Sequence, residues 1–500
     1  MSRLASARAR TAAVNRRVNY AGLVRVAVAA AAGAALVHVA VAEPVSVDLV
    51  AASGEPETPM VGSALATRVA QTCSGGELSG IPGVPDVKLP ASLTVAAGPA
   101  TLLPAKPPQA GALTATSGSK QLLEVDSRSR AVTAKLPATG PVSLVGEGAF
   151  APAVAASQEW LVNGKDLRGL ASAPCAPGVS DMWLLGGGAG PGRQERLVLT
   201  NPGANPVTAD VTVHGDAGPV GDPRVETVPP GGRVTLLLDA LAPAEPHPAV
   251  HVTADGGGLN GTLTDTWVDG STPLGAETTT PTAAPATVHV VPAAVFGTAA
   301  TSLRVAVPGE QEAVVKVTVL AKDGLVPLTG ETVLSVGAGA VGELPLTGVP
   351  AGTDAVVLRS DVPVVASVLS RVGDPKAPGD FAWSVAATGV QRVGGAAFAA
   401  VPNVSRSLHL VATGGSSTAE VVSVIDGTPR SQTVELQSDH LATISLDDAT
   451  SVWVRASGGS GELRGAVVSS SGKGPAQLLS SMPLLESAVT SPVSRAFPLP

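Results

Sequence analysis

One passage recurs four times along the chain, and this repeat constrains the fold more than any other feature of the sequence. Each copy has an alternating apolar segment, a short turn rich in Gly, Asp or Pro, and a second alternating segment, a pattern typical of a β-hairpin. The copies begin at Val142, Val250, Val356 and Val452, in steps of 108, 106 and 96 residues, roughly the length of one β-sandwich module. The sequence therefore predicts an all-β chain of tandem antiparallel β-sandwich modules, immunoglobulin-like in architecture.

The second and third copies agree over more than the repeated passage. Leu303 corresponds to Leu197, and the Pro308-Gly309 turn corresponds to Pro202-Gly203. The linkers between copies are short, which predicts modules that pack against one another. The four predicted modules span 86–170, 183–279, 288–373 and 381–480, with a stalk at 43–85 before them and a C-terminal tail at 481–500 after them.

The composition limits how the module cores can be built. Aromatic residues are scarce, with five Trp, five Phe and one Tyr among 500 residues. The cores must therefore consist mainly of Val, Leu and Ala, of which Val suits the half-buried surface of a strand best.

The first 42 residues have the charge pattern of an export leader. Residues 1–25 contain six arginines and no acidic residue, and residues 26–42 are apolar apart from His38. This order predicts a basic cytoplasmic n-region and then a signal peptide or a signal-anchor helix, by which the chain contacts the membrane. Ala40-Val41-Ala42 fits a cleavage site, whereas the apolar run of 17 residues approaches the length of a spanning helix. Both outcomes remain open, and either predicts an extracytoplasmic protein, anchored in the cell membrane or secreted.

Charge and cysteine content narrow the class further. Without the six leader arginines, 26 basic and 40 acidic side chains leave the exported part at a net charge of −14. An exported part with this net negative charge lacks the positive surface that binds nucleic-acid phosphates, so nucleic acid is excluded as a partner. The only two cysteines are Cys73 and Cys175. Because an exported chain folds in an oxidising compartment, we predict a disulfide between them.

The second module carries a resemblance to a known family. It rests on Cys175, the segment Trp183–Gly188, the segment Leu197–Gly203 and the segment Val211–Gly215. These segments resemble a family of exported actinobacterial proteins that is catalogued only as a domain of unknown function. The resemblance implies a membrane-anchored or secreted envelope protein and supplies no catalytic residues.

Glycine-rich segments are the first candidates for a ligand site. Gly256–Gly261 and Gly337–Gly342 have the spacing of a dinucleotide-binding loop. That loop works only where its glycines open a helix, and strand-like sequence follows both segments, so we interpret them as turns or bulges. We interpret Gly186–Gly192 as a flexible strand connection rather than a ligand-facing loop. No cofactor is predicted.

Other side chains with chemical potential are dispersed. His247 and His251 are four residues apart, but Pro246 and Pro248 break any helix there, so no metal site is predicted. No GxSxG motif is present, and the expected disulfide leaves no free thiol nucleophile, so no enzyme is predicted. We interpret the remaining carboxylates as turn residues that bond their own backbone, with calcium at module junctions as the alternative. These carboxylates are Asp265, Asp269, Asp361 and Asp447-Asp448.

The sequence favours a non-enzymatic cell-envelope protein that acts as a structural scaffold or a protein-interaction module. The alternative is an array of carbohydrate-binding modules for envelope glycans, which requires several of the five tryptophans to be exposed for stacking on sugars. We expect the tryptophans to be buried instead, because the modules lack other large side chains. The partner is an envelope protein or glycan that the sequence does not name.

Overall fold

The fold is described from a computed structural model, which covers residues 62–297, 299–374 and 377–493. The predicted n-region at 1–25, the predicted leader helix at 26–42 and the first part of the predicted stalk lie outside these residues. In the described part, nearly all elements are β-strands, which confirms the all-β class. The helices in that part are α2 (Leu238–Leu241) and the 3-10 turns η1 (Ala100–Leu102) and η2 (Gly474–Ala476), and none of them could span a membrane.

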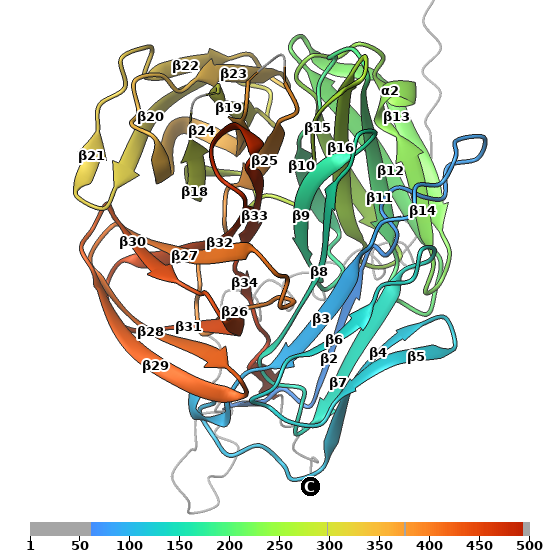
Figure 1. Ribbon diagram of the computed structural model, residues 1–500, viewed down its shortest axis with the longest axis vertical. Coiled ribbons are helices and arrows are strands. Elements are labelled where there is room, and N and C mark those ends of the chain that lie inside the picture. Colours follow the sequence, from blue (N-terminus) through green and yellow to red (C-terminus); the bar gives the residue numbers. More distant parts are fainter. Residues whose placement is uncertain (1–61, 298, 375–376, 494–500) are drawn as a thin grey trace, which may run out of the picture. The chain divides into compact units, whose positions relative to one another are not determined.

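Each module consists of two antiparallel sheets in the same strand order (Figure 1). We call one the outer sheet and the other, whose final strand faces the other modules, the axial sheet. In the first module the outer sheet is β2 (Arg68–Cys73), β7 (Val142–Gly148), β4 (Gly111–Ser117), β5 (Lys120–Val125), and the axial sheet is β6 (Val132–Lys135), β3 (Ser92–Ala97), β8 (Val154–Asn163), β9 (Arg168–Pro174). In the second module the outer sheet is β10 (Asp181–Leu185), β15 (Ala249–Asp255), β12 (Val207–Gly215), β13 (Gly218–Val228), and the axial sheet is β14 (Arg233–Leu237), β11 (Arg193–Thr200), β16 (Asn260–Asp269), β17 (Thr272–Thr279).

The third module differs because one long strand, β24 (Gly352–Val372), belongs to both of its sheets. Its first half lies in the outer sheet with β18 (Ala286–Phe296), β20 (Ala313–Ala321), β21 (Gly324–Val326) and β22 (Val333–Val336), and its second half lies in the axial sheet with β19 (Thr301–Ala306), β23 (Val341–Pro345) and β25 (Asp380–Val385). The fourth module has an outer sheet of β34 (Leu485–Glu486), β26 (Gly394–Ala397), β31 (Ala449–Gly459), β28 (Ser417–Ile425), β29 (Thr428–Leu436) and an axial sheet of β30 (His440–Ser445), β27 (Val404–Thr413), β32 (Glu462–Ser471), β33 (Leu478–Pro483).

The alternating sequence explains why these segments form sandwiches. In β20, for example, Val315, Val317 and Val319 are buried while Lys316 between them is exposed. Successive side chains of a strand point to opposite faces, so such a segment buries one apolar face against the partner sheet. Each module has its own core, built mainly from Val, Leu and Ala as the composition predicts.

The predicted hairpins at the repeated passage are wrong. β7 pairs with β2 and β4, and β8 pairs with β3 and β9, so the two halves of the first passage lie in different sheets. The same holds for β15 with β16 and for β31 with β32, and in the third module the two halves are one continuous strand. The reason is that two arrangements give the same sequence pattern. Two strands joined by a short turn have alternating apolar residues when they pair through backbone hydrogen bonds in one sheet, and also when they face each other across the core from different sheets. The pattern therefore does not show which of the two arrangements is present.

Three predicted boundaries also change. β2 and the buried side chain of Glu77 lie in the predicted stalk at 43–85, so the first module begins earlier than residue 86. β34 and β35 (Thr490–Val493) lie in the predicted tail at 481–500, and β35 pairs with β1 (Gly62–Leu65). β25 pairs with β24 of the third module, although the predicted boundary at 381 gives most of it to the fourth. Strands that pair only with distant partners leave a weak local signal.

The modules pack against one another, as their short linkers predict. Trp453 of the fourth module is fully buried beside Ala96 and Ala155 of the first. Trp183 of the second module is buried beside Ala306 and Val365 of the third. Apolar side chains therefore fill the interfaces between modules as well as the module cores.

Candidate functional site

The last strands of the four axial sheets lie against one another in a closed cycle. β9 contacts β17 and β33, and β25 also contacts β17 and β33. The first and fourth modules are thus neighbours, although the chain reaches the fourth only after the second and third. We call the polar side chains buried among these four strands the axial cluster.

Asp380 lies at the centre of the axial cluster and is 1% exposed. Its Oδ1 accepts a hydrogen bond from the backbone N–H of Ala276 at 3.2 Å, and its Oδ2 accepts one from Leu479 at 2.8 Å. The backbone N–H groups of Leu170 and Phe381 also bond to this carboxyl. One side chain therefore takes a backbone hydrogen bond from each of β9, β17, β25 and β33. Burial raises the pKa of Asp380 well above its usual range, and these four hydrogen bonds oppose the shift.

Glu277 on β17 is the second carboxyl of the axial cluster and is fully buried. Its Oε1 accepts hydrogen bonds from the Ser480 hydroxyl at 3.1 Å and from the backbone N–H of Thr278 at 2.9 Å. Its Oε2 has no hydrogen-bond partner among the described residues. Burial raises the pKa of Glu277 well above its usual range, and the charge of Asp380 raises it further.

The Glu277→Gln variant tests whether the folded protein keeps the Glu277 carboxyl protonated. A raised pKa means that the folded state binds more protons than the unfolded state once the pH exceeds about 4.3, the ordinary Glu value. The wild-type protein should then lose stability as the pH rises, by at most about 1.4 kcal/mol per pH unit for this group. We expect the Gln variant to match the wild type near pH 4 and to be more stable at pH 8, measured by urea denaturation at both pH values. A variant that is less stable than the wild type at pH 8 would contradict a protonated Glu277.

A buried ion pair of the second module also contacts the third module. Arg193 binds Asp265 through two bonds, at 2.9 Å from Nε to Oδ1 and at 2.5 Å from Nη2 to Oδ2. The indole N–H of Trp383 in the third module donates to the same Asp265 at 2.9 Å. Burial and the charge of Asp265 raise the pKa of the adjacent Glu195 to about 8. This pair is closed to solvent and acts as a link between the second and third modules.

Two further arginines bridge modules in the same way. Arg304 of the third module donates to the carbonyls of Gly187 and Pro248 in the second, each at 3.1 Å, and pairs with Glu343 at 3.0 Å. Arg406 of the fourth module pairs with Glu159 of the first at 3.2 Å, and both side chains are buried. The pair of Arg406 and Glu159 joins the fourth module to the first and so closes the cycle of four modules.

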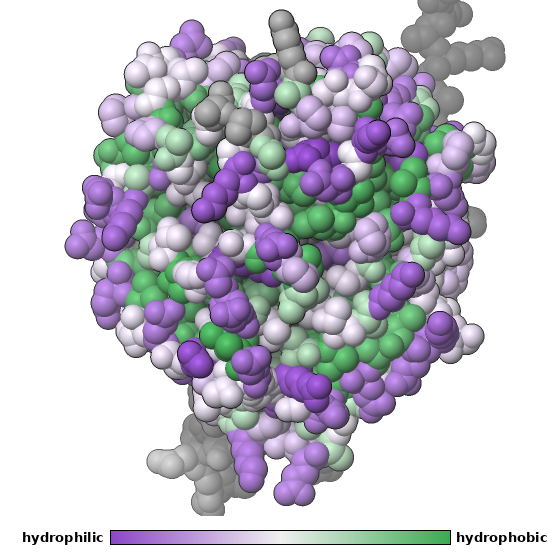
Figure 2. Space-filling model, in the orientation of Figure 1, coloured by the Kyte–Doolittle hydropathy of each residue, from purple (hydrophilic) through white to green (hydrophobic). Residues whose placement is uncertain are grey.

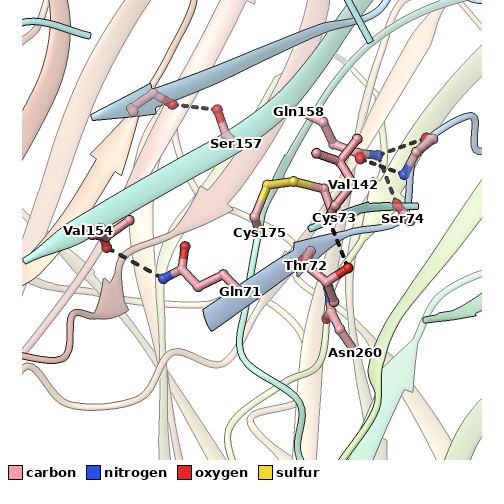
Figure 3. Close-up of a disulfide and its surroundings, with 12 residues drawn as sticks. Gln71, Thr72, Cys73, Ser74, Val142, Val154, Ser157, Gln158, Cys175 and Asn260 are labelled. Carbon is pink, nitrogen blue, oxygen red and sulfur yellow. Dashed lines mark hydrogen bonds between the residues drawn. A yellow bond between two sulfur atoms is a disulfide. The ribbon is translucent and has the colours of Figure 1, made fainter. Parts of the chain in front are cut away.

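The predicted disulfide between Cys73 and Cys175 is confirmed (Figure 3). Cys73 ends β2 of the outer sheet and Cys175 follows β9 of the axial sheet, so the bond joins the two sheets of the first module. Both residues lie in its core, and their Cα atoms are 4.5 Å apart. The neighbouring Thr72 carbonyl accepts a hydrogen bond from the Asn260 side chain at 2.8 Å, which connects this region to the second module (Figure 3).

The other residues singled out in the sequence have structural surroundings. Gly186–Gly188 are buried between modules, where the N–H of Gly188 donates to Glu195 at 2.8 Å. The segments Gly256–Gly261 and Gly337–Gly342 lead into strands β16 and β23, as their interpretation as turns requires. His251 lies on β15, stacked on Trp183 at 4.3 Å between ring centroids, and its Nε2 is 3.0 Å from Asp181. His247 precedes β15 and contacts Asp216 at 2.7 Å instead.

The interpretation of Asp265 as a turn carboxylate is wrong, because it lies within β16 in the buried pair with Arg193. The turn interpretation of Asp361 is also wrong, because Asp361 lies within the continuous strand β24 and accepts a backbone hydrogen bond from Val314 of the neighbouring strand β20 at 2.8 Å. Sequence reasoning also missed Glu159, Glu277 and Asp380. A usable signal existed: a charged residue inside an otherwise apolar strand is rare unless it is paired in the interior.

The expected burial of the tryptophans holds for four of the five. Trp160, Trp183, Trp383 and Trp453 are at most 3% exposed. Trp267 is half-buried, with the guanidinium groups of Arg193 and Arg371 at 5.0 and 4.7 Å from its ring. These positions do not form a row of exposed rings.

A cleft of about 1040 Å³ lies between the first two modules. One wall is the turn between β8 and β9, with Lys165, Asp166 and Arg168. The floor is the face of β11 and β16 that carries Gln194, Arg196, Thr266 and Val268, and Leu78 and Val87 close the side. Unlike the axial cluster, this cleft is open to a ligand.

The comparisons with known proteins place the chain in a family. A model described as a family of unknown function, DUF5719, matches residues 127–472. The chain belongs to DUF5719. This confirms the resemblance to a family of unknown function, whereas the actinobacterial origin stays an expectation. The DUF5719 match covers part of the first module, the whole of the second and third, and most of the fourth.

Two further comparisons add little to the DUF5719 assignment. No curated protein matches the chain. Among solved structures, it is similar to one titled "Biofilm associated protein - BSP domain", with 10% sequence identity, coverage of 84% of this chain and 96% of that chain, and a TM-score of 0.12. A likeness at that TM-score carries no argument, so the fold rests on the strand pairing described above.

Proposed function

We propose that this protein is a non-enzymatic component of the cell envelope, a rigid scaffold of four fused modules that binds an envelope partner outside the cytoplasm. The observation that supports it most is the closed cycle of β9, β17, β25 and β33, with the ion pair of Glu159 and Arg406 buried between the first and fourth modules. Separating such a pair would leave a charge buried without its partner, at a cost of about 3–5 kcal/mol. The modules therefore keep fixed relative positions, which is what a scaffold requires.

The proposed location rests on the sequence of residues 1–42 and on the disulfide. A basic segment before an apolar run is typical of an export signal, and disulfides persist in oxidising compartments. An alkaline phosphatase fused after Pro500 should be active, and the same fusion without residues 26–42 should be inactive. Equal activity in both fusions would contradict export.

Exposed apolar side chains on strands of the outer sheets support a protein partner. Leu325 on β21 is 70% exposed, Val225 on β13 is 58% exposed and Val333 on β22 is 48% exposed. Figure 2 shows one face of the molecule, on which separate apolar patches lie among hydrophilic residues. Apolar patches with polar borders are typical of protein contact surfaces.

The partner can be sought by site-specific photo-crosslinking in intact cells. A photoreactive residue at position 325 should form adducts, while the same residue at 430, a polar position of β29, should not. Adducts at neither 225, 325 nor 333 would contradict a partner at these surfaces. A purified protein that turns over an envelope substrate, and loses that activity on a single substitution, would contradict the non-enzymatic assignment.

The alternative of a carbohydrate-binding array loses its main support from the tryptophans. It requires several exposed indole rings, and four of the five are buried. Iodide should therefore quench only the Trp267 fraction of the fluorescence. If iodide quenched most of the tryptophan emission, several indole rings would be exposed, and the carbohydrate-binding alternative would regain its support.

A further inference from the structure

The cleft between the first two modules contains an arginine, Arg196, whose guanidinium has no hydrogen-bond acceptor among the described residues. Arg196 lies on the floor of the cleft and is 5% exposed. Burial lowers the pKa of Arg196, and the charge of Asp86 opposes this shift. A guanidinium has five N–H donors. The nitrogens of Arg196 are not among the fully enclosed polar atoms that lack a partner, so they are accessible from the cleft.

The two neighbouring arginines show what a structural arginine does in this region. Arg233 donates to the carbonyls of Ser74 and Gly76, each at 2.8 Å. Arg168 donates to the carbonyls of Gly379 at 3.1 Å and Ala476 at 2.6 Å. Both side chains hold separate segments together by donating to their backbone carbonyl groups. Arg196 does nothing of this kind, so its donors are free for a ligand.

The charge of the cleft is opposite to that of the chain. Its lining has three cationic side chains, Lys165, Arg168 and Arg196, and one acidic side chain, Asp166. The whole sequence carries a net charge of −8. A positive cleft in an acidic protein attracts anions locally.

The rest of the lining suits a hydroxylated ligand. Asn163, Gln194 and Ser271 line the cleft with amide and hydroxyl groups and are exposed. The Oδ1 of Asn163 accepts a hydrogen bond from Arg168, which leaves its NH₂ group for a ligand. Leu78 and Val87 give it apolar surface. Its volume of about 1040 Å³ is close to the upper end of the range for small-molecule sites, about 300–1,000 Å³. An anion with hydroxyl groups and some apolar ring faces matches this combination.

We propose that this cleft binds a sugar that carries a carboxylate, with the carboxylate on the guanidinium of Arg196 and the sugar hydroxyls on Asn163 and Gln194. The planar fork of an arginine binds a carboxylate through two parallel hydrogen bonds. Lys165 at the rim adds attraction at longer range. The inference goes beyond the scaffold proposal and does not depend on where the protein is located.

The binding test uses the full-length protein, trigalacturonic acid and isothermal titration calorimetry. The matched ligand is the methyl ester of trigalacturonic acid, which keeps the sugar and removes the charge. We expect the acid to bind and the ester to bind at least about tenfold more weakly, as for the loss of a charge-assisted hydrogen bond. Arg196→Met should weaken binding of the acid by roughly 10- to 150-fold. Arg430→Gln, which removes an exposed arginine of β29, should leave it unchanged.

A second measurement separates binding from structure. If Arg196 serves a ligand, Arg196→Met removes an unpartnered buried charge and should raise the ligand-free Tm, by about 2–5 °C. A fall in Tm would make Arg196 a structural residue and overturn the proposal. Equal binding of acid and ester would also overturn it, as would unchanged affinity in Arg196→Met. Inorganic phosphate and a glutamate-rich peptide are tested in the same way. If either of them binds and trigalacturonic acid does not, the cleft binds a different anion and the carboxylated sugar is rejected.

Discussion

Replacing both Cys73 and Cys175 by serine is expected to lower the free energy of unfolding by about 4–5 kcal/mol. The bond closes a loop with a sequence separation of 102 residues, and the entropy that a cross-link removes from the unfolded chain grows with loop length. Both residues are at most 2% exposed in the core of the first module, so the serines would also place two hydroxyl groups in an apolar environment. Guanidinium chloride denaturation of the variant and the wild type, without reductant, measures the difference.

The reduced wild-type protein is the control for the serine hydroxyls. Reduction removes the cross-link and leaves the sulfur atoms in the core, so it isolates the contribution of the bond. We expect the reduced protein to fall between the oxidised wild type and the double variant. A loss of less than about 1 kcal/mol on reduction would mean that the bond has little effect on the stability of the first module.

The second large effect is expected for Asp380→Asn, which should destabilise the protein by about 3 kcal/mol or more. Both carboxyl oxygens of Asp380 accept backbone hydrogen bonds, and the donors come from all four axial strands. Asparagine has nearly the same shape but replaces one acceptor oxygen by an NH₂ group, which would face N–H donors. The buried N–H groups left without an acceptor each carry a desolvation penalty. Thermal and chemical denaturation near pH 4 measure the loss, because at higher pH the raised pKa of Asp380 costs the wild type stability that the Asn variant does not lose.

Asp323→Asn is the matched control, because it makes the same chemical change at an exposed carboxylate in the turn between β20 and β21. We expect it to change stability by no more than about 0.5 kcal/mol. If Asp380→Asn behaved like this control, the axial carboxyl would not hold the four strands together.

The sequence predicts the units of this structure better than their assembly. The fourfold alternation gives the all-β class, the module count and the apolar cores, because strand periodicity is a local property. The two cysteines give the disulfide, since they are the only possible pair. The same local signal misassigned the repeated passage as a hairpin, because strands facing across a core and strands paired in a sheet alternate alike.

The assembly depends on contacts that a single sequence does not indicate. Glu159 and Arg406 are 247 residues apart, and nothing near either residue names the other as its partner. The cleft is built from separate segments around residues 78–87, 163–168, 192–196 and 266–273. The cleft and the contacts between modules form only when the modules come together. In the sequence, the one local sign of these contacts is a charged residue inside an otherwise apolar strand.

The first and fourth modules meet and so close the ring of four modules around the axial cluster. A double-mutant cycle on Glu159 and Arg406 tests this contact most directly. Glu159→Gln, Arg406→Met and the double variant are compared with the wild type by chemical denaturation. Residues in contact typically show coupling energies of 0.5–3 kcal/mol, and we expect about 1–3 kcal/mol for this buried pair. Effects that simply add, within about 0.5 kcal/mol, would mean that the two modules do not meet and would contradict the closed cycle.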